Sequence, residues 1–469
     1  MNAYYLVSVI GNRVLALLTV LVLSYLLTPS DFGIFTIILT NALVIHLLFS
    51  SWVSNSSWKT VSVGDEQGQK VAISTSLGYA SILSLVALSI STIVLIIDND
   101  RFYYVGITLL LTVTILFYDL VMVIKNARGL SKDHGTTSFL RGLWTFCLSA
   151  SLTWLGFGVA GAIIGQIVGT AATILFQRSF WIMWRYFDPG HIFRGGVTAQ
   201  IKFGLISVFA LNLYLMGNAL CRNIILLGLG EAEAGFFSLS ADMFFAPVAI
   251  FAVTASLSST PELYRSAGTD SASQHASEFI GGVLAVAIPY ALAGLFTGPS
   301  VAHMFLGSDL AVPIARIAPH SIIHATCFCI LSTQTTIALT QGRLKLAVGL
   351  PLATLALIAS VLLGAHLIAG PNGISLLGYA QAVTAALLLM TAVVLGASRS
   401  VLQVPIPWKE CLRVLGASLV MCLVLAALTL FPVPFTPLPE IAIGIATFFG
   451  AAHLLGSRIL RNLIRLSAT

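Results

Sequence analysis

Several ionisable side chains lie inside long apolar stretches of this chain, where burying a charge is unfavourable and a function is the default explanation. Arg13 stands about 15 Å into the first stretch, at a helical rise of about 1.5 Å per residue. Tyr5, Ser8, Asn12 and Thr19 share one helical face beside it. A polar face with a buried cation suits a water-filled cavity that accepts a phosphate; the alternative is a face that hydrogen-bonds a neighbouring helix. Arg13 and Asn12 are therefore candidate substrate-binding residues.

A second cation, Arg222, precedes an acidic turn at Glu231, and Asp242 follows that turn. Their depths differ by about 3 Å if both segments are helical, so the two side chains can pair across the hairpin. The pair either stabilises the hairpin or couples transport. In the second case Asp242 takes up a proton or a sodium ion and releases Arg222 for an anionic substrate. Arg222 and the adjacent Asn223 are substrate-binding candidates, and Asp242 is an ion-coupling candidate.

A basic stripe follows at Arg316, His320 and His324, which recur at every fourth position of another apolar stretch. One interpretation is an exit path for an anionic substrate, with histidines that titrate near neutral pH. Another is a set of side chains that reach the membrane interface. A metal site is a third, since His pairs at this spacing can chelate, but no acidic residue completes a ligand motif. We take the three residues as substrate-binding candidates and predict no metal site.

Asp119 lies near the end of a further apolar stretch, shortly before Lys125. It either reaches the interface or takes part in cation coupling, so it is the second ion-coupling candidate. His46 and His366 suit satisfied or interfacial histidines. Coupling to a proton or sodium ion is the only cofactor-like requirement that we expect.

Nothing in the sequence predicts an enzyme. The glycine-rich stretch at 156–169 has no P-loop lysine, and the four-residue spacing of Gly161, Gly165 and Gly169 suits close helix packing instead. The cysteines form no CxxC pair, which argues against a zinc site or a disulfide framework. They are Cys147, Cys221, Cys327, Cys329, Cys411 and Cys422.

The composition places these residues in a membrane. Of the 469 residues, 58% are hydrophobic and only 9% are charged, and the mean hydropathy is +0.98. A soluble domain carries about 25% charged residues, so soluble, disordered and nucleic-acid-binding proteins are excluded. A membrane-spanning helix needs roughly 20 apolar residues, and fourteen of them account for about 60% of the chain. We predict an all-α polytopic membrane protein.

Short polar breaks divide the apolar sequence into fourteen spans, and each span must be a helix because lipid cannot hydrate open backbone groups. The predicted spans are 3–28, 32–54, 73–97, 103–124, 138–156, 158–180, 203–228, 234–257, 279–296, 314–338, 346–368, 374–396, 412–431 and 440–457.

Most Lys and Arg residues fall in every second loop between the predicted spans. If the N-terminus is cytoplasmic, 19 of the 23 Lys and Arg residues fall on the cytoplasmic side, whereas only Arg101 and Arg316 fall outside. Arg13 and Arg222 lie within spans. Since positive charges concentrate on the cytoplasmic side, both termini are expected there.

A weak internal repeat relates the first hairpin to the one that joins spans seven and eight. Leu-Thr-Pro-Ser-Asp-Phe-Gly at 27–33 and Glu-Ala-Glu-Ala-Gly-Phe-Phe at 231–237 both start a helix after an acidic turn. Six spans separate them, so the two halves have the same orientation in a parallel repeat. We expect an N-terminal lobe at 1–200, a C-terminal lobe at 201–396, and a helix pair with a basic tail at 397–469.

The first hairpin, Arg13 to Ile38 with Leu-Leu-Thr-Pro-Ser-Asp-Phe-Gly-Ile-Phe at its centre, resembles the polysaccharide-transporter family. These proteins are the Wzx-type flippases of the multidrug/oligosaccharidyl-lipid/polysaccharide exporter superfamily. The hairpin from Arg222 to Ser238 and the segment Met304-Phe305-Leu306-Gly307 also resemble parts of that family. One departure is Cys221, because the family often has Asp before the Arg of the seventh helix.

The resemblance implies a flippase for undecaprenyl-pyrophosphate-linked oligosaccharides that serve the synthesis of O-antigen, capsule or exopolysaccharide. It implies alternating access through a cationic cavity in the bacterial inner membrane. A polysaccharide polymerase and export machinery are then candidate partners, and no nucleic acid is expected.

Two other functions stay open. An exporter of small cations, from the multidrug branch of the superfamily, predicts an acidic cavity, whereas two or three arginines here face Asp119 and Asp242. A polysaccharide polymerase or ligase needs a substantial outer loop, and the longest one here is only 297–313.

Overall fold

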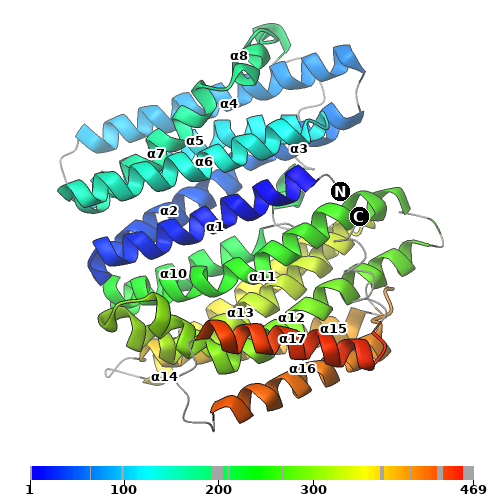
Figure 1. Cartoon of the computed structure of the whole chain (residues 1–469). Helices are drawn as coiled ribbons and strands as arrows, with labels where there is room; N and C mark the ends of the chain where they lie inside the picture. The colour runs from blue at the N-terminus through cyan, green and yellow to red at the C-terminus, as the bar shows by residue number, and fades with distance from the viewer. Residues whose placement is uncertain are drawn as a thin grey trace. The chain divides into compact units, whose positions relative to one another are not determined.

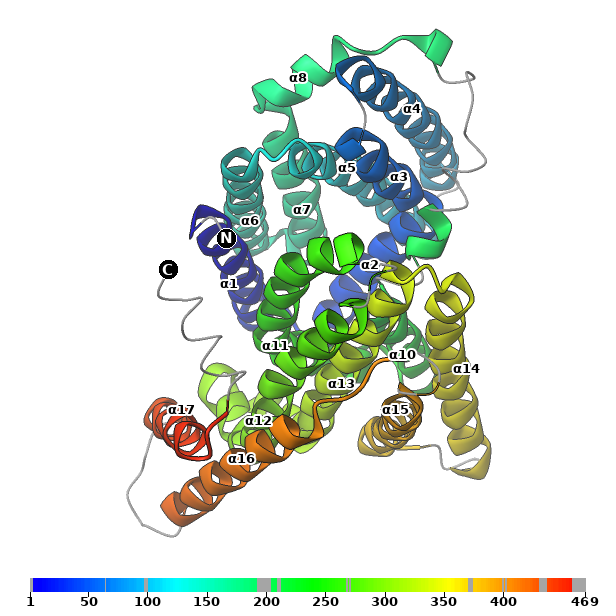
Figure 2. The ribbon, with the colours of Figure 1, turned by 90° about the vertical axis from the view of Figure 1, so that its right-hand side faces the viewer.

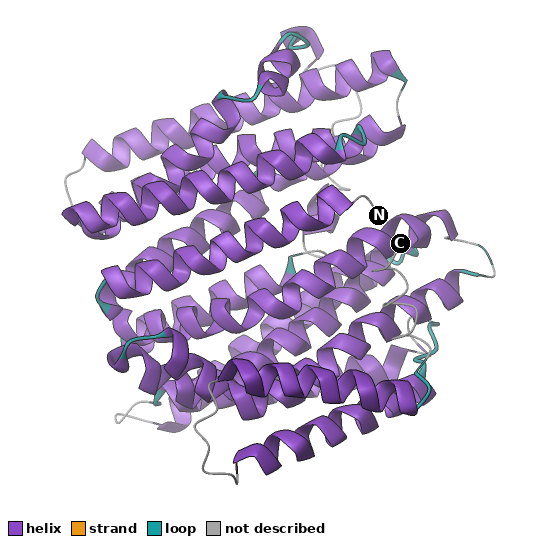
Figure 3. Cartoon of the chain, viewed as in Figure 1, coloured by secondary structure: helices purple, strands orange, loops and turns teal. Residues whose placement is uncertain are grey.

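The computed structural model describes residues 3–63, 65–96, 100–191, 204–208, 212–266, 269, 271–369, 374–398, 400, 403–429 and 437–457. These ranges are helical apart from short turns and contain no strand (Figure 3). The chain forms two compact units, Met1–Ala219 and Leu220–Thr469. The domain limits expected from the sequence, at 200 and 396, stay predictions.

In its described residues, the first unit is built from eight helices that are labelled in Figure 1 and from two short helical segments, η1 and η2. They are α1 (Ala3–Leu26), α2 (Pro29–Phe49), α3 (Ser51–Val63), α4 (Glu66–Ile96), α5 (Asp100–Ala127), α6 (Ser131–Leu152), η1 (Thr153–Phe157), α7 (Gly158–Leu175), α8 (Arg178–Trp184) and η2 (Pro189–His191).

The second unit contains longer helices, several with internal prolines. They are α10 (Leu213–Leu229, which begins in the first unit), α11 (Glu231–Ser266), α12 (Ala272–Phe305), α13 (Ser308–Thr340), α14 (Leu344–Ala369), α15 (Leu376–Ala397), α16 (Trp408–Thr429) and α17 (Pro437–Leu454).

Each of the fourteen predicted spans overlaps a described helix, although α10 begins only at Leu213, within the span expected at 203–228. Within the described ranges, nine helices are long and apolar enough to cross a membrane, and three shorter apolar helices accompany them. The span expected at 32–54 covers two helices, because α2 ends at Ser50, whose φ of −133° leaves the helical region. The prediction of an all-α polytopic membrane fold is confirmed.

The turn at 28–32, part of the family-like motif, is stabilised by local hydrogen bonds. Thr28 Oγ1 accepts a hydrogen bond of 3.2 Å from the Asp31 backbone N–H and donates one of 2.8 Å to the Asp31 carboxylate. Pro29 then starts α2 with a fixed φ and no N–H to satisfy. Phe32 and Phe35, on the first turns of α2, are each 1% exposed. The motif therefore caps α2 and anchors its start.

The hairpin between α6 and α7 depends on two glycines with left-handed backbone. Gly156 has φ of 93° and Gly158 has φ of 52°, a region that other residues rarely adopt. The chain reverses here and α7 packs along α6. A Cβ at Gly165 would collide with the Ser149 backbone, and one at Gly169 with the Thr145 backbone. The close packing predicted from the glycine spacing is confirmed.

The two units repeat one pattern of helix pairs. In the first unit α5 packs against α2, α4, α6 and α7, and α6 packs against α7. In the second unit α13 packs against α11, α12, α14 and α15, and α14 packs against α15. Figure 2 gives a second view of both sets of helices. The fourth and tenth spans, α5 and α13, are thus the central helices of the two repeats. The last pair, α16 and α17, packs against α12.

Candidate functional site

The buried ion pair between α10 and α11 is present. Arg222 Nη2 lies 2.5 Å from Asp242 Oδ1 and 3.4 Å from the Ser238 carbonyl oxygen, to which it also donates. The Arg222 side chain is 4% exposed, whereas that of Asp242 is 31% exposed. The pairing predicted from depth across the hairpin is confirmed. The guanidinium is enclosed, and the carboxylate is the member that a small cation can reach.

The residues next to the pair are also apolar or partly enclosed. Cys221, at the position where the family often has Asp, is 1% exposed. Asn223, the other candidate on α10, is half-buried. Position 221 therefore provides no acidic side chain to Arg222. The acid that contacts Arg222 is Asp242, from the next helix.

The three basic residues of α13 become more buried along the helix, and the two histidines contact α15. Arg316 is exposed, His320 is half-buried and His324 is buried. His320 Nδ1 and His324 Nε2 each lie 3.0 Å from Thr384 Oγ1, and His324 Nε2 is also 3.2 Å from the Ala380 carbonyl oxygen. The two histidines therefore converge on one hydroxyl. No group of three metal-ligating side chains occurs in the part of the chain that the structure describes.

Two neighbouring residues of α11 contact the ion pair and His324, respectively. Ser238 accepts from Arg222, while the neighbouring Phe237 ring lies 6.2 Å from the His324 ring. One turn along the chain, Ser240 Oγ lies 2.7 Å from Ser321 Oγ of α13. A polar layer within the second unit thus links α10, α11, α13 and α15.

A second acidic site lies in the first unit. His46 Nε2 of α2 lies 3.3 Å from Asp119 Oδ2 of α5, and His46 Nδ1 lies 2.8 Å from Ser50 Oγ. The His46 side chain is 5% exposed and that of Asp119 is 36% exposed. Asp119 therefore pairs with a buried histidine, a contact that sequence reasoning missed.

Arg141 of α6 completes this site. Its guanidinium lies 4.3 Å from the Tyr118 ring centroid, and its Nε donates to Thr170 Oγ1 at 3.4 Å. Tyr118 directly precedes Asp119 on α5. At sequence level Arg141 contributed only to the cytoplasmic charge. The signal that could have found it is its position inside the predicted span at 138–156.

The predicted polar face of α1 turns in part towards α6. Arg13 and Asn12 are half-buried, and Asn12 Oδ1 points at Gly142 of α6. Thr19 is buried, and its hydroxyl donates to the Leu15 carbonyl at 2.8 Å. The side chains of Tyr5 and Ser8 lie outside the described residues. Asn12 thus faces a neighbouring helix, whereas the Thr19 hydroxyl bonds within α1.

Several of the candidates thus make specific contacts, and these fall in different units. Arg222, Asp242, His320 and His324 belong to the second unit, and Asp119 belongs to a separate set with His46 and Arg141 in the first. Each set holds one carboxylate that is about one-third exposed and one partner that is enclosed. Such a pair can bind a small cation in exchange for its internal partner.

Comparison with known proteins defines the fold. No protein-family model matches the chain, and no curated protein matches it. The lipid II flippase MurJ in an inward closed conformation matches with a TM-score of 0.73 and 14% identity, over 98% of this chain and 99% of that one. An inward-facing multidrug resistance MATE family transporter of the MOP superfamily matches with a TM-score of 0.61 and 15% identity, over 84% and 94% of the two chains.

A further match is a MOP superfamily transporter from Pyrococcus furiosus with a binding pocket described as having reverse polarity. It gives a TM-score of 0.58 and 14% identity, over 86% of this chain and 95% of that one. The chain thus has the fold of the multidrug/oligosaccharidyl-lipid/polysaccharide exporter superfamily. It is a multi-pass membrane protein, and its structural neighbours are flippases and transporters rather than enzymes.

Proposed function

We propose that the protein is a flippase that moves undecaprenyl-pyrophosphate-linked oligosaccharide repeat units across the bacterial inner membrane. These units would supply the synthesis of O-antigen, capsule or exopolysaccharide, with a polymerase and export machinery as partners. The fold shared with a lipid II flippase supports transport of a lipid-linked substrate. The motif at 27–33 supports the polysaccharide branch.

The observation that carries this proposal is the enclosed arginine at Arg222. A guanidinium inside an apolar helix bundle needs an anion, and its planar donors match carboxylate and phosphate oxygens equally well. In the structure the anion is Asp242. A pyrophosphate can take its place once Asp242 is neutralised.

The exposed fraction of Asp242 supports the following order of events in the proposal. A proton or a sodium ion binds the accessible carboxylate and cancels its charge, which removes the electrostatic partner of Arg222. Arg222, with Asn223 beside it, then binds the pyrophosphate. When the cation leaves, Asp242 competes for Arg222 again and the substrate dissociates. Alternating access in this form needs no covalent step.

The remaining candidates take supporting roles in the proposal. Arg13 and Asn12 of α1 serve the anionic head group in the first unit. Arg316 and His320 lead from the surface to the polar layer at His324. Asp119, with His46, is a second coupling site.

A second candidate function is cation-coupled export of small molecules. It is favoured by the two partly exposed carboxylates and by the match to MATE family transporters. Under that function the carboxylates bind the transported cation itself.

The two functions separate in the native host. We would delete the gene, extract the lipid-linked sugars and stain the surface polysaccharide. A flippase predicts loss of the polymer and accumulation of undecaprenyl-linked repeat units, restored by the wild-type protein but not by an Arg222→Ala variant. Unchanged surface polymer, in a host without a second flippase, would reject the proposal, and efflux of a cationic dye would then test the alternative.

A further inference from the structure

The segment from α8 to η2 is held against the start of α4. Ser74 Oγ donates to the Asp188 carbonyl at 3.1 Å and accepts from the Asp188 N–H at 2.8 Å. Thr75 Oγ1 donates to the His191 carbonyl at 3.3 Å. These contacts join parts of the chain that are more than a hundred residues apart in sequence, so the segment has a defined place in the first unit.

The inner face of α8 is part of the core. Phe180 and Met183 are buried in the cluster that α4 and α5 form. The Phe180 ring meets the Trp184 ring edge-on at 6.0 Å and the Phe117 ring of α5 at 6.4 Å. Aromatic packing of this kind fixes the rotation of α8 about its own axis.

The outer face of α8 is exposed, basic and aromatic. Arg178, Trp181 and Arg185 follow one another at helical spacing and are all exposed. The Trp181 indole N–H donates to the Leu175 carbonyl at 2.8 Å, so its polar atom is satisfied while its ring stays 54% exposed. Phe176, just before α8, is 82% exposed. Neither arginine has an acidic partner among the described residues.

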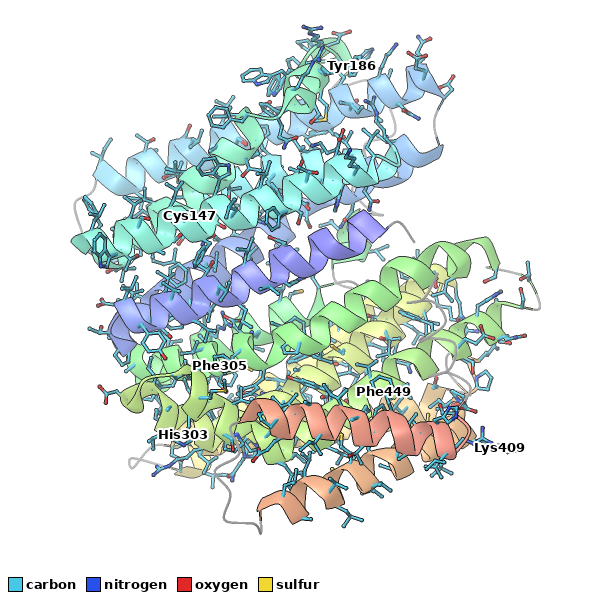
Figure 4. All side chains as sticks on the ribbon, viewed as in Figure 1. Cys147, Tyr186, His303, Phe305, Lys409 and Phe449 are labelled. Carbon is cyan, nitrogen blue, oxygen red and sulfur yellow. The ribbon has the colours of Figure 1, made fainter. Side chains whose placement is uncertain are left out.

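Two more cations meet at Tyr186, which is labelled in Figure 4. Lys70 Nζ of α4 lies 5.9 Å from the Tyr186 ring centroid, and Cζ of Arg128, just after α5, lies 5.7 Å from it. Lys70 also pairs with Glu66 at 2.6 Å, whereas Arg128 has no acidic partner in the described part of the chain. Arg128 therefore adds a third uncompensated positive charge to those of Arg178 and Arg185.

The other charged groups nearby are already engaged. Lys125 is buried and donates to Thr137 Oγ1 at 2.6 Å and to Gln177 Oε1 at 2.7 Å. Asp188 accepts from the Gly190 N–H at 2.8 Å and lies 3.6 Å from His191 Nε2. The local acids thus leave Arg128, Arg178 and Arg185 unneutralised.

We infer that Arg178, Trp181 and Arg185 of α8, together with Arg128 beside Tyr186, bind the head group of an anionic phospholipid. Tryptophan rings prefer the level of the head groups, and arginines attract the phosphates of anionic lipids. The exposed Phe176 and Trp181 rings reach the acyl boundary while the guanidinium groups contact the phosphate. This inference depends only on the structure of the first unit and not on the transported substrate.

The test is the affinity of the purified full-length protein for phosphatidylglycerol, measured in detergent by native mass spectrometry. We expect retention of phosphatidylglycerol in preference to phosphatidylethanolamine. A basic residue near an anionic lipid surface contributes about fivefold in affinity, so Arg178→Gln with Arg185→Gln should weaken phosphatidylglycerol binding by about 30-fold. Arg178→Lys with Arg185→Lys should keep most of it.

A matched control removes two exposed charges elsewhere. Lys345→Gln with Lys409→Gln changes the net charge equally, and lipid retention should stay at the wild-type level. Glycerol 1-phosphate should not displace the lipid; if it does, the site binds free phosphate and the inference is wrong. Equal retention of the two lipids, or an unchanged affinity in the glutamine variant, would also overturn it. If that double variant does not fold, Arg185→Gln alone replaces it, with about a fivefold loss expected.

Discussion

Arg222 Nη2 lies 2.5 Å from Asp242 Oδ1, and the two partners differ in access: the arginine side chain is 4% exposed and the carboxylate 31%. This asymmetry distinguishes the pair from a purely internal salt bridge. The carboxylate is the more accessible member of the pair, whereas the guanidinium is enclosed. The pair is therefore suited to switch between an internal and an external partner.

Removing only the acid should destabilise the second unit. Asp242→Ala leaves Arg222 buried without its counter-ion, and breaking such a pair lowers the free energy of unfolding by about 3–5 kcal/mol. Arg222→Met with Asp242→Leu removes both charges, so its thermal midpoint in detergent should return close to wild type. A transport assay on this double variant then separates the two roles. Restored stability without transport supports coupling, and restored stability with full transport would show that the pair is structural.

Asp119→Asn should reduce the dependence of transport on the ion gradient. The amide keeps the size of the carboxylate but has no negative charge and cannot take up a proton opposite His46. We expect a loss of gradient-driven transport of at least about tenfold, which corresponds to about 1.4 kcal/mol. The control is Asp133→Asn at the exposed start of α6. Equal transport in the Asp119 and Asp133 variants, measured in vesicles with an imposed gradient, would remove Asp119 from the coupling mechanism.

Thr384→Val should loosen the contact between α13 and α15. Its hydroxyl is the shared partner of His320 and His324, so its loss leaves the buried His324 with one contact, to the Ala380 carbonyl. Leaving a buried polar group under-satisfied lowers the free energy of unfolding by about 1–3 kcal/mol. Thr354→Val is the matched control, because the buried Thr354 hydroxyl donates only to Leu350 of its own helix. Similar thermal midpoints for the two variants would mean that the histidines do not depend on Thr384.

Gly165→Ala should separate α6 from α7. A Cβ at this position collides with the backbone of Ser149, which cannot move aside as a flexible side chain would. Overpacking of this kind lowers the free energy of unfolding by about 1–3 kcal/mol. Gly349→Ala, where a Cβ meets open space, should have little effect or stabilise α14 slightly. Thermal unfolding of the two single variants in detergent gives the comparison; equal midpoints would contradict close packing at Gly165.

The order and approximate position of the apolar spans could be predicted from the sequence because a bilayer imposes length and hydropathy on every span. The Arg222–Asp242 pair could also be predicted, because the two residues belong to one short hairpin and depth alone places them together. The reversal at Gly156 and Gly158 likewise followed from local sequence. In each case the relevant information lies within a few tens of residues.

Contacts between distant spans could not be predicted in the same way. His46 and Asp119 lie on α2 and α5, and their contact depends on how far each helix is rotated about its axis. The convergence of His320 and His324 on Thr384 has the same origin. Periodicity shows that Asn12 and Thr19 share a face of α1, but it does not show that Asn12 points at Gly142 of α6. The sequence does not show which helices pack together or in which direction each side chain points. The three-dimensional structure supplies both.

We propose that Arg222 binds the pyrophosphate of a lipid-linked oligosaccharide during translocation. The most direct measurement uses proteoliposomes with the purified protein and an undecaprenyl-pyrophosphate-linked repeat unit, and follows how much of the glycan becomes accessible to an added glycosidase on the opposite face. We predict translocation by the wild-type protein under an imposed cation gradient, a partial rate for Arg222→Lys, and none for the stably folded Arg222→Met/Asp242→Leu variant. Equal glycan exposure in wild-type and protein-free liposomes would contradict the flippase, and equal rates in the wild type and the double variant would contradict the role of Arg222.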